Sequence, residues 1–492
     1  MKYIILILLF LFSSFPVYAS VADYINSVAK CCDDESYRSF SKIVKGEASI
    51  SDLEKQLIID NEISDELNSQ FLYTDLENCI KIALERNFDI KIQDSYKDES
   101  YWLYKNSQFQ LLPDFFYNYN ISNLQGRYLV GGIVATTTNE IPIQSFFVMQ
   151  WSTINQGKYF FLIAQTKNAL ESSAAKLEFT KEQVIRDTVL SYYDALEKKL
   201  EVEVQKVNIF ERLEQLRYTQ ARFEAGIGTL YDVKRAQAEV AGAQQEYATT
   251  LNSLRLRIAV LANVMGVDIL DAVYPFEFQV DKRVLVNPHF DIESLYKQAL
   301  ESREDIRAKK AEIEVYRAQR SSNYTDIVPE ITLSYQNGLV GTKRRGMSGH
   351  NSITLDIRAH LGKNLLMGTI TQIKADSALV KAKKLELIDL KRQVKENILT
   401  YYYDSLNALK KIDASKVETE AADVSLDLSL ANMKAGQATF IDVIASQNLK
   451  VQANINLIKN MIEYNRSQTK LLFEIGMLTP QSVLKNYESR FY

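Results

Sequence analysis

The chain has 492 residues, of which 46% are hydrophobic and 24% are charged, and its formal net charge is −4 at pH 7. Acidic and basic residues are interspersed, so there is no basic segment of the kind that nucleic-acid binding requires, and we expect no nucleic-acid partner. The three histidines and the cysteines Cys31, Cys32 and Cys79 have no catalytic or metal-ligand spacing. We therefore expect no enzyme activity, no cofactor and no metal site, and leave a disulfide among the cysteines open.

The chain begins with a segment typical of exported proteins. One lysine precedes an apolar run over residues 3–12, and the small residue Ala19 follows. This pattern predicts a signal peptide over residues 1–19. A membrane anchor is the alternative, but the apolar run is too short to span a bilayer.

Four segments have apolar residues at every second position, which predicts strands with one apolar and one polar face. Ile353, Leu355 and Ile357, for example, alternate with polar residues. One pair of strands is expected within residues 113–151 and the other within residues 329–360. Loops are expected over residues 122–142 and 337–351.

A long stretch without glycine or proline follows each strand pair, at residues 158–225 and 369–435. Strong helix formers dominate both stretches. At about 1.5 Å per residue, each stretch predicts a helix on the order of 100 Å long. Such length indicates coiled-coil packing against other helices.

The motif A-x-x-x-A-G-x-x-T-x-x-D-V ends both long helices, at residues 221–233 and 431–443. Its glycine accepts the left-handed geometry of a helix C-terminus. Its threonine can cap the return helix, and its aspartate lies in the first turn of that helix. Each half therefore predicts a helical hairpin with a tight tip. The motif residues are Gly226, Thr229 and Asp232 in the first copy and Gly436, Thr439 and Asp442 in the second.

The chain is thus a duplicated unit of mainly α structure with a β part. We expect a first repeat over residues 71–266, a linker over 267–291, a second repeat over 292–478 and a tail over 479–492. The strand pairs are either half-buried hairpins on a helix bundle or part of a transmembrane β-barrel with lipid outside and water inside. Four strands cannot close a barrel, because small barrels need roughly eight, so a barrel would require several chains.

The doubled tip motif, the strand pair before each long helix and the opening segment Leu76–Ile90 resemble the TolC-like outer-membrane efflux proteins, also called outer membrane factors. The resemblance covers residues 71 to 479. It implies a homotrimer in which each chain gives four strands to one 12-stranded barrel in the outer membrane. The long helices would form a hollow coiled-coil barrel in the periplasm, and residues 20–70 would be a periplasmic extension.

The resemblance also implies a function. Members of this family are ducts of tripartite efflux or type I secretion systems, and they work with a periplasmic adaptor protein and an inner-membrane transporter. The tips would then contact the adaptor through Gly226, Thr229, Gly436 and Thr439. Asp442 and its counterpart Asp232 would line a constriction of the lumen. The family's second acidic residue is replaced by Ala445, and its latch tyrosine and arginine by Met433 and Ala438.

Aromatic residues near strand ends are candidates for contact with outer-membrane lipid at the membrane interface, with ordinary packing as the alternative. They are Trp151, Tyr117, Tyr119 and Tyr335. Asp442 likewise has a purely structural alternative, in which it only favours the N-terminus of its helix. For the whole chain, the alternative to a duct is a periplasmic coiled-coil scaffold of the same fold that does not span the membrane.

Overall fold

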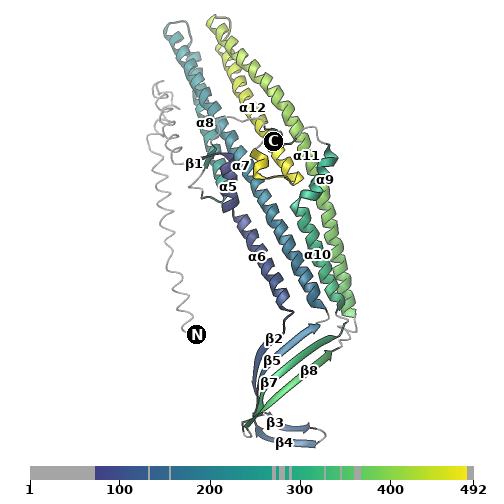
Figure 1. The fold of residues 1–492 in the computed structure, drawn as a ribbon. Helices are drawn as coiled ribbons and strands as arrows, with labels where there is room; N and C mark the ends of the chain where they lie inside the picture. Colours follow the sequence, from purple (N-terminus) through teal and green to yellow (C-terminus); the bar gives the residue numbers. More distant parts are fainter. Residues whose placement is uncertain are drawn as a thin grey trace, which may run out of the picture.

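The computed structural model describes residues 72–122, 124–130, 133–154, 157–268, 273–275, 283–286, 291–325, 328–343, 346–358 and 367–484. The predicted signal peptide, Cys31 and Cys32 lie outside these residues, as does the predicted extension. The molecule is elongated, with a sheet at one end and the tips of two helical hairpins at the other (Figure 1). None of the helices in the described ranges is both long and apolar enough to cross a membrane.

The same order of elements occurs twice. In each copy two helices lead into the sheet, and a long helix and its return helix follow. The first copy consists of α5 (Leu76–Arg86), α6 (Phe88–Phe109), β2 (Asp114–Ile121), β5 (Pro142–Ile154), α7 (Lys158–Glu224) and α8 (Leu230–Met265). The second copy consists of α9 (Ile292–Ser302), α10 (Glu304–Tyr324), β7 (Glu330–Thr342), β8 (Gly346–Arg358), α11 (Met367–Lys434) and α12 (Phe440–Ile475), and α13 (Pro480–Leu484) follows.

Both predicted loops between the strands are wrong. Within residues 122–142 the chain forms a second antiparallel hairpin, β3 (Leu124–Val130) with β4 (Ile133–Glu140). β4 is rich in β-branched residues, which favour strands, and a Gly-Gly pair separates the two segments in the sequence. In the second half, β7 and β8 extend through most of residues 337–351 and leave only a short connection. A further short pair, β1 (Leu72–Thr74) with β6 (Val273–Pro275), is parallel and connects the start of the first repeat to the linker.

The main sheet is antiparallel in the order β2-β5-β7-β8. Its register aligns Phe115 with Met149, Met149 with Tyr335, and Tyr335 with Ile353. Because residues directly opposite each other project from the same face, these apolar residues of the four strands share one face, whereas Phe116, Phe146 and Val148 project from the reverse face. Phe115 is 74% exposed and Ile353 is 76% exposed. The predicted alternation is confirmed, and it yields a broad apolar face that the chain itself leaves uncovered.

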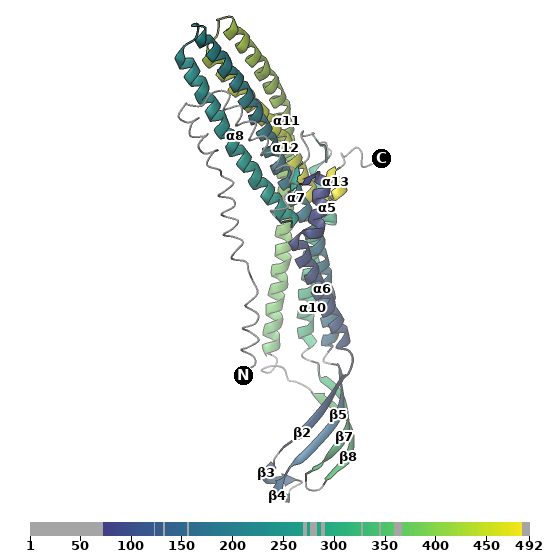
Figure 2. The ribbon, with the colours of Figure 1, turned by 90° about the vertical axis from the view of Figure 1, so that its left-hand side faces the viewer.

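The helical part is held together along the long helices. α7 packs on α8, α11 packs on α12, and α7 also packs on α12, so the two hairpins lie against each other (Figure 2). Val189, Tyr192 and Leu196 of α7 and Leu261 of α8 are fully buried in the main core. The expected packing of each long helix against other helices is confirmed.

Each return helix ends at a glycine with left-handed φ, Gly266 or Gly476. At Gly266 a Cβ atom would lie 2.7 Å from the backbone oxygen of Arg86, whereas at the tip glycine Gly436 no atom lies within 4 Å of that position. Both glycines have positive φ, so alanine costs about 1–2 kcal/mol at either site. The close backbone contact at Gly266 adds to that cost.

Gly266→Ala is therefore expected to lower the thermal midpoint of the purified protein more than Gly436→Ala does. Thermal unfolding followed by circular dichroism measures both. Equal shifts for the two variants would show that the contact between Gly266 and Arg86 does not constrain the fold.

Candidate functional site

The two hairpin tips lie side by side at the end of the molecule opposite the sheet, in both Figure 1 and Figure 2. Gly226 has φ 74° and Gly436 has φ 75°. After the first glycine, the backbone N–H groups of Ile227 and Gly228 donate to the carbonyl of Arg222, both at 3.0 Å. The same pattern recurs at Asn432 in the second tip. The predicted glycine-terminated helix ends are confirmed in both copies.

The two caps that follow are not identical. At the second tip, Thr439 Oγ1 accepts a hydrogen bond from the backbone N–H of Asp442. Asp442 Oδ2 accepts in return from the backbone N–H of Thr439 at 2.8 Å and from its hydroxyl at 2.7 Å. At the first tip, Thr229 caps the backbone of Asp232 and donates its hydroxyl to that carboxylate. The reciprocal capping box is thus complete at the second tip, where these bonds from Thr439 lower the pKa of Asp442 below its ordinary value.

Asp442→Ala is expected to fray the first turn of α12 more than Asp232→Ala frays the first turn of α8, because only the Asp442 carboxylate accepts from the backbone N–H of its threonine. The stability from the Asp442 carboxylate is present above its unperturbed pKa of 3.8 and is lost as pH falls through the lowered value. Hydrogen exchange of the first-turn amides should therefore separate Asp442→Ala from the unmodified protein at pH 7, and the difference should shrink in strong acid. Unchanged exchange in the variant at pH 7 would contradict this role of the cap.

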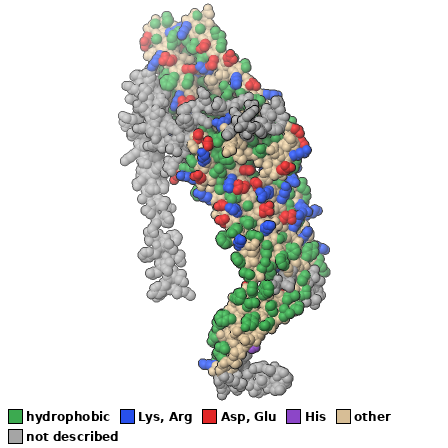
Figure 3. Space-filling view, viewed as in Figure 1, with side chains coloured by type: hydrophobic (Ala, Val, Ile, Leu, Met, Phe, Trp, Pro, Cys, Tyr) green, Lys and Arg blue, Asp and Glu red, His purple; other side chains and the backbone are tan. Residues whose placement is uncertain are grey.

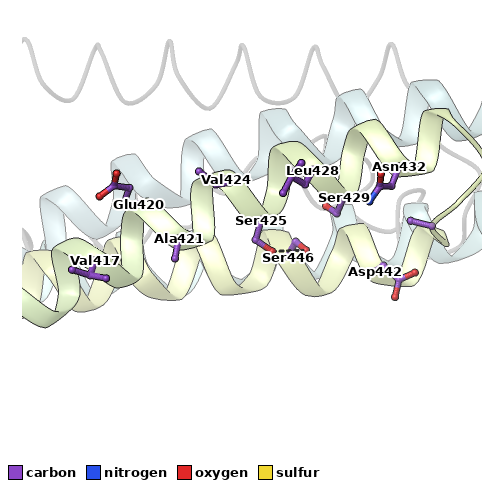
Figure 4. A pocket seen from close by; sticks show the side chains of 11 residues that line it. Val417, Glu420, Ala421, Val424, Ser425, Leu428, Ser429, Asn432, Asp442 and Ser446 are labelled. Carbon is purple, nitrogen blue, oxygen red and sulfur yellow. Dashed lines mark hydrogen bonds between the residues drawn. The ribbon is translucent and has the colours of Figure 1, made fainter.

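A groove of about 740 Å³ runs between α11 and α12 beside the second tip (Figure 4). Val417, Ala421, Val424 and Leu428 of α11 line it at spacings of four, three and four residues. This is the apolar spacing of a coiled-coil seam. Val417, Val424 and Leu428 are all more than half exposed.

The other side of the groove is built from small residues. Ala438 and Ser446 line it, with Asp442 at its end near the tip. Ser425 and Ser446 face each other across the two helices with their hydroxyl oxygens 3.4 Å apart. Small residues beside an apolar stripe leave room for one further helix to approach closely. Asp442 could be identified from the sequence, but the groove could not, because its lining comes from two helices.

Polar contacts join the two hairpins below the tips. Arg212 of α7 donates through Nη2 to Asn448 of α12 at 2.6 Å, and Lys450 of α12 pairs with Glu211 of α7 at 3.1 Å. Farther from the tips, Arg466 of α12 pairs with Asp194 and Glu197 of α7. These contacts tie the two hairpins of one chain to each other. The places of Asp442 and Asp232 in a lumen constriction stay predictions.

The four aromatic residues predicted at a membrane interface lie on the apolar face of the sheet. Trp151 Nε1 donates to the carbonyl of Leu111 at 3.1 Å, so its polar atom is satisfied at the junction with the helices. The hydroxyl oxygen of Tyr117 lies 2.7 Å from that of Ser145, and Tyr119 and Tyr335 are exposed. Hydrophobic side chains gather over the sheet, whereas charged ones cover the helical part (Figure 3). The contact of the four aromatic residues with lipid stays a prediction.

Among the side chains that the structure describes, no group of three or more His, Cys, Asp or Glu residues is placed to hold a metal ion. His350 lies on the reverse face of the sheet, where its ring packs on Phe146 at a centroid distance of 5.8 Å. Cys79 is fully buried in the main core.

Comparisons with known proteins agree with this geometry. The model of the outer membrane efflux protein family matches residues 154–267 and 295–476. Nodulation protein T of Rhizobium leguminosarum bv. trifolii is 25% identical over 316 residues, which cover 63% of this chain and 66% of the relative. The outer membrane protein TolC of Escherichia coli (strain K12) is 21% identical over 323 residues, which cover 62% of this chain and 63% of TolC. The chain therefore matches slightly less than two thirds of the length of these relatives.

Solved structures show the same fold. The CmeC outer membrane channel of Campylobacter jejuni superposes with a TM-score of 0.73 at 14% identity, covering 82% of this chain and 85% of CmeC. The open state of the MtrE outer membrane channel of Neisseria gonorrhoeae gives a TM-score of 0.67 at 16% identity. The mainly helical fold with a four-stranded sheet, as predicted from the sequence, is confirmed.

Proposed function

Because the chain belongs to the outer membrane efflux protein family and resides in the outer membrane, we propose that it is the export duct of a tripartite efflux or type I secretion system. In this role, substrates would enter at the hairpin tips from an inner-membrane transporter and a periplasmic adaptor. They would leave through the sheet end.

The observation that carries this proposal is the exposed apolar face of an antiparallel sheet whose reverse face carries mostly polar residues on β7 and β8. Leu333 and Leu355 are paired on the apolar face, and Ser334 and Thr354 are paired on the other. A transmembrane barrel has this alternation, with apolar residues toward lipid and polar residues toward a water-filled interior. A scaffold outside the membrane, the alternative function, would leave the apolar face in water, and it is not favoured for a member of this family.

Assembly from several chains follows from the edges of the sheet. β2 and β8 each have one neighbour in the four-stranded sheet, so one row of backbone groups on each is unpaired. Within a membrane those groups must be paired, which requires a closed barrel. The strand order allows β8 of one copy to pair antiparallel with β2 of the next. Three copies then give the 12 strands that the family resemblance implies.

The groove beside the second tip is the proposed contact for the adaptor. Its apolar stripe has coiled-coil spacing, and its small residues admit one further helix. Leu428 is the residue of this stripe nearest the tip, and 58% of its surface is exposed. Any helix that occupies the groove would cover this position. A charged side chain here would then be buried without a partner, which is energetically costly.

Leu428→Arg is expected to reduce adaptor-dependent export at least tenfold while the protein stays assembled in the outer membrane. Asp427→Arg is the matched control, because Asp427 is exposed on the same helix and lies outside the groove lining. The two variants are compared by the accumulation of an exported dye in cells and by the protein content of the outer membrane. Equal export by both variants would exclude this groove as the contact.

A further inference from the structure

A cavity of about 600 Å³ lies where the end of α12 meets the start of α10, and residues of α7, α10, α11 and α12 line it. At this place a Cβ atom on Gly476, the last cap of α12, would lie 3.0 Å from the backbone nitrogen of Arg303, which precedes α10. Lys176 of α7 and Gln393 of α11 belong to the lining and are exposed, so the cavity is open to solvent. Its volume is within the range of small-molecule sites, about 300–1,000 Å³.

Part of this lining is apolar and held in place by the core. The rings of Phe179 on α7 and Phe473 on α12 lie with their centroids 5.6 Å apart. Phe473 belongs to the main core, and Phe179 and Leu390 of α11 pack against that core. Half-buried aromatic and aliphatic side chains of this kind can cover the flat ring of a ligand.

The carboxylates that line the cavity already have cations. Asp305 and Glu474 pair with Arg303 at 2.7 and 2.6 Å. Glu312 pairs with Lys309 at 3.1 Å. A positively charged ligand would therefore have to compete with a cation of the protein for each of these three carboxylates.

Two cations of α7 are placed to bind an anion. The guanidinium of Arg186 lies 4.3 Å from the centroid of the Phe473 ring, and its Nε donates to Asp187, the next residue of the helix. The contact with the ring fixes the guanidinium in the lining, and its terminal nitrogens are the donors that a carboxylate or sulfonate prefers. Lys176 lies ten residues earlier, about 15 Å along the helix, and none of the carboxylates in the described part of the chain pairs with it.

The other copy of the repeat lacks these cations. The tip motifs begin at residues 221 and 431, so residues 210 positions apart are equivalent. The equivalents of Lys176 and Arg186 are Glu386 and Glu396. A long helix of this repeat therefore folds with either sign of charge at both positions, and the duplicated fold does not require the cations of α7.

We propose that this cavity binds a small aromatic anion, with its ring against Phe179 and Leu390 and its acidic group at Arg186. The apolar lining gives such a ligand buried area, and the guanidinium gives it charge-assisted hydrogen bonds. The ligand would contact α7 of the first hairpin and α11 and α12 of the second, so its binding would link the two hairpins. This inference goes beyond the proposed export function and does not depend on what the protein exports.

The probe for this site is naphthalene-2-sulfonate, whose aromatic rings carry a permanent negative charge. Isothermal titration calorimetry of the full-length protein in a nonionic detergent, with the detergent blank subtracted, measures its binding. Saturable binding of one probe per chain is expected. Naphthalene-2-sulfonamide has the same rings without the charge, and it should bind at least about tenfold more weakly, because it loses the charge-assisted hydrogen bonds.

Variants of α7 test the position of the acidic group. Arg186→Gln should bind the sulfonate about tenfold more weakly. Lys176→Gln removes a charge from the exposed rim and should weaken binding about threefold. Lys181→Gln is the matched control, since Lys181 lies on the same helix outside the cavity lining and pairs at the surface with Glu178. This control should keep the affinity of the unmodified protein.

Circular dichroism shows whether each variant is folded. If Arg186→Gln does not fold, Lys176→Gln decides the case, because its side chain is exposed. The proposal is overturned if the sulfonate shows no saturable binding, if both probes bind equally, or if Lys176→Gln and Lys181→Gln have the same affinity. The readout requires no transport, so its outcome is independent of the proposed function.

Discussion

A Leu355→Arg variant is expected to lose most of its assembly into the outer membrane. Leu355 lies on the apolar face of β8, opposite Leu333, and 62% of its surface is exposed. An arginine on the lipid face costs about 2–4 kcal/mol near the middle of the bilayer. In an oligomeric barrel, every copy of the chain adds this free-energy cost. The amount of protein in the outer-membrane fraction, detected by immunoblotting, measures the effect.

Thr354→Arg is the control for this substitution, because Thr354 is the preceding residue of the same strand and projects from the polar face. An arginine there would project toward water, so membrane assembly should be close to normal. Similar assembly of both variants would mean that the apolar face does not meet lipid.

The second large effect is expected at Arg303. Only 6% of its side chain is exposed. Burial alone would lower its pKa, but the carboxylates of Asp305 and Glu474 raise it, so the guanidinium stays charged. Arg303→Met leaves both carboxylates buried without their cation, and removal of one partner from a buried ion pair costs about 3–5 kcal/mol. The thermal midpoint measured by circular dichroism should therefore fall by several degrees.

Arg392→Met provides the comparison for Arg303→Met. Arg392 pairs with Asp389 on α11, but both side chains are more than half exposed. Exposed pairs contribute at most about 1 kcal/mol, so this variant should unfold close to the normal temperature. Adding Glu474→Gln to Arg303→Met should recover part of the lost stability. If the two single variants unfold at the same temperature, the ion pairs of Arg303 with Asp305 and Glu474 do not stabilise the fold.

Much of this fold could be predicted because its strongest signals are local. A long stretch without glycine or proline permits one continuous helix, and the structure places α7 and α11 within two residues of the predicted limits. Gly226 and Gly436 mark the tips through their own backbone geometry. The alternation around Leu355 predicts both the strand and its apolar face, which the register of the sheet confirms.

The missed features depend on contacts between residues that are far apart in the sequence. Arg303 gives no signal until α12 brings Glu474 to it. The groove is invisible in either helix alone, because Leu428 and Ser446 line it from opposite sides. The hairpin of β3 and β4 had a local signal in its β-branched residues, but its glycines were interpreted as marks of a loop. Asp442 was found as a cap, whereas its predicted place in a constriction involves neighbouring chains and stays a prediction.

The most direct test is native mass spectrometry of the protein extracted in detergent from outer membranes. The sheet of one chain ends in the unpaired edges of β2 and β8, and three copies are proposed to close them into a single barrel around a water-filled path. The expected mass is that of three chains, without a stable one-chain species. Recovery of a single folded chain that stays dissolved without detergent would contradict the shared barrel.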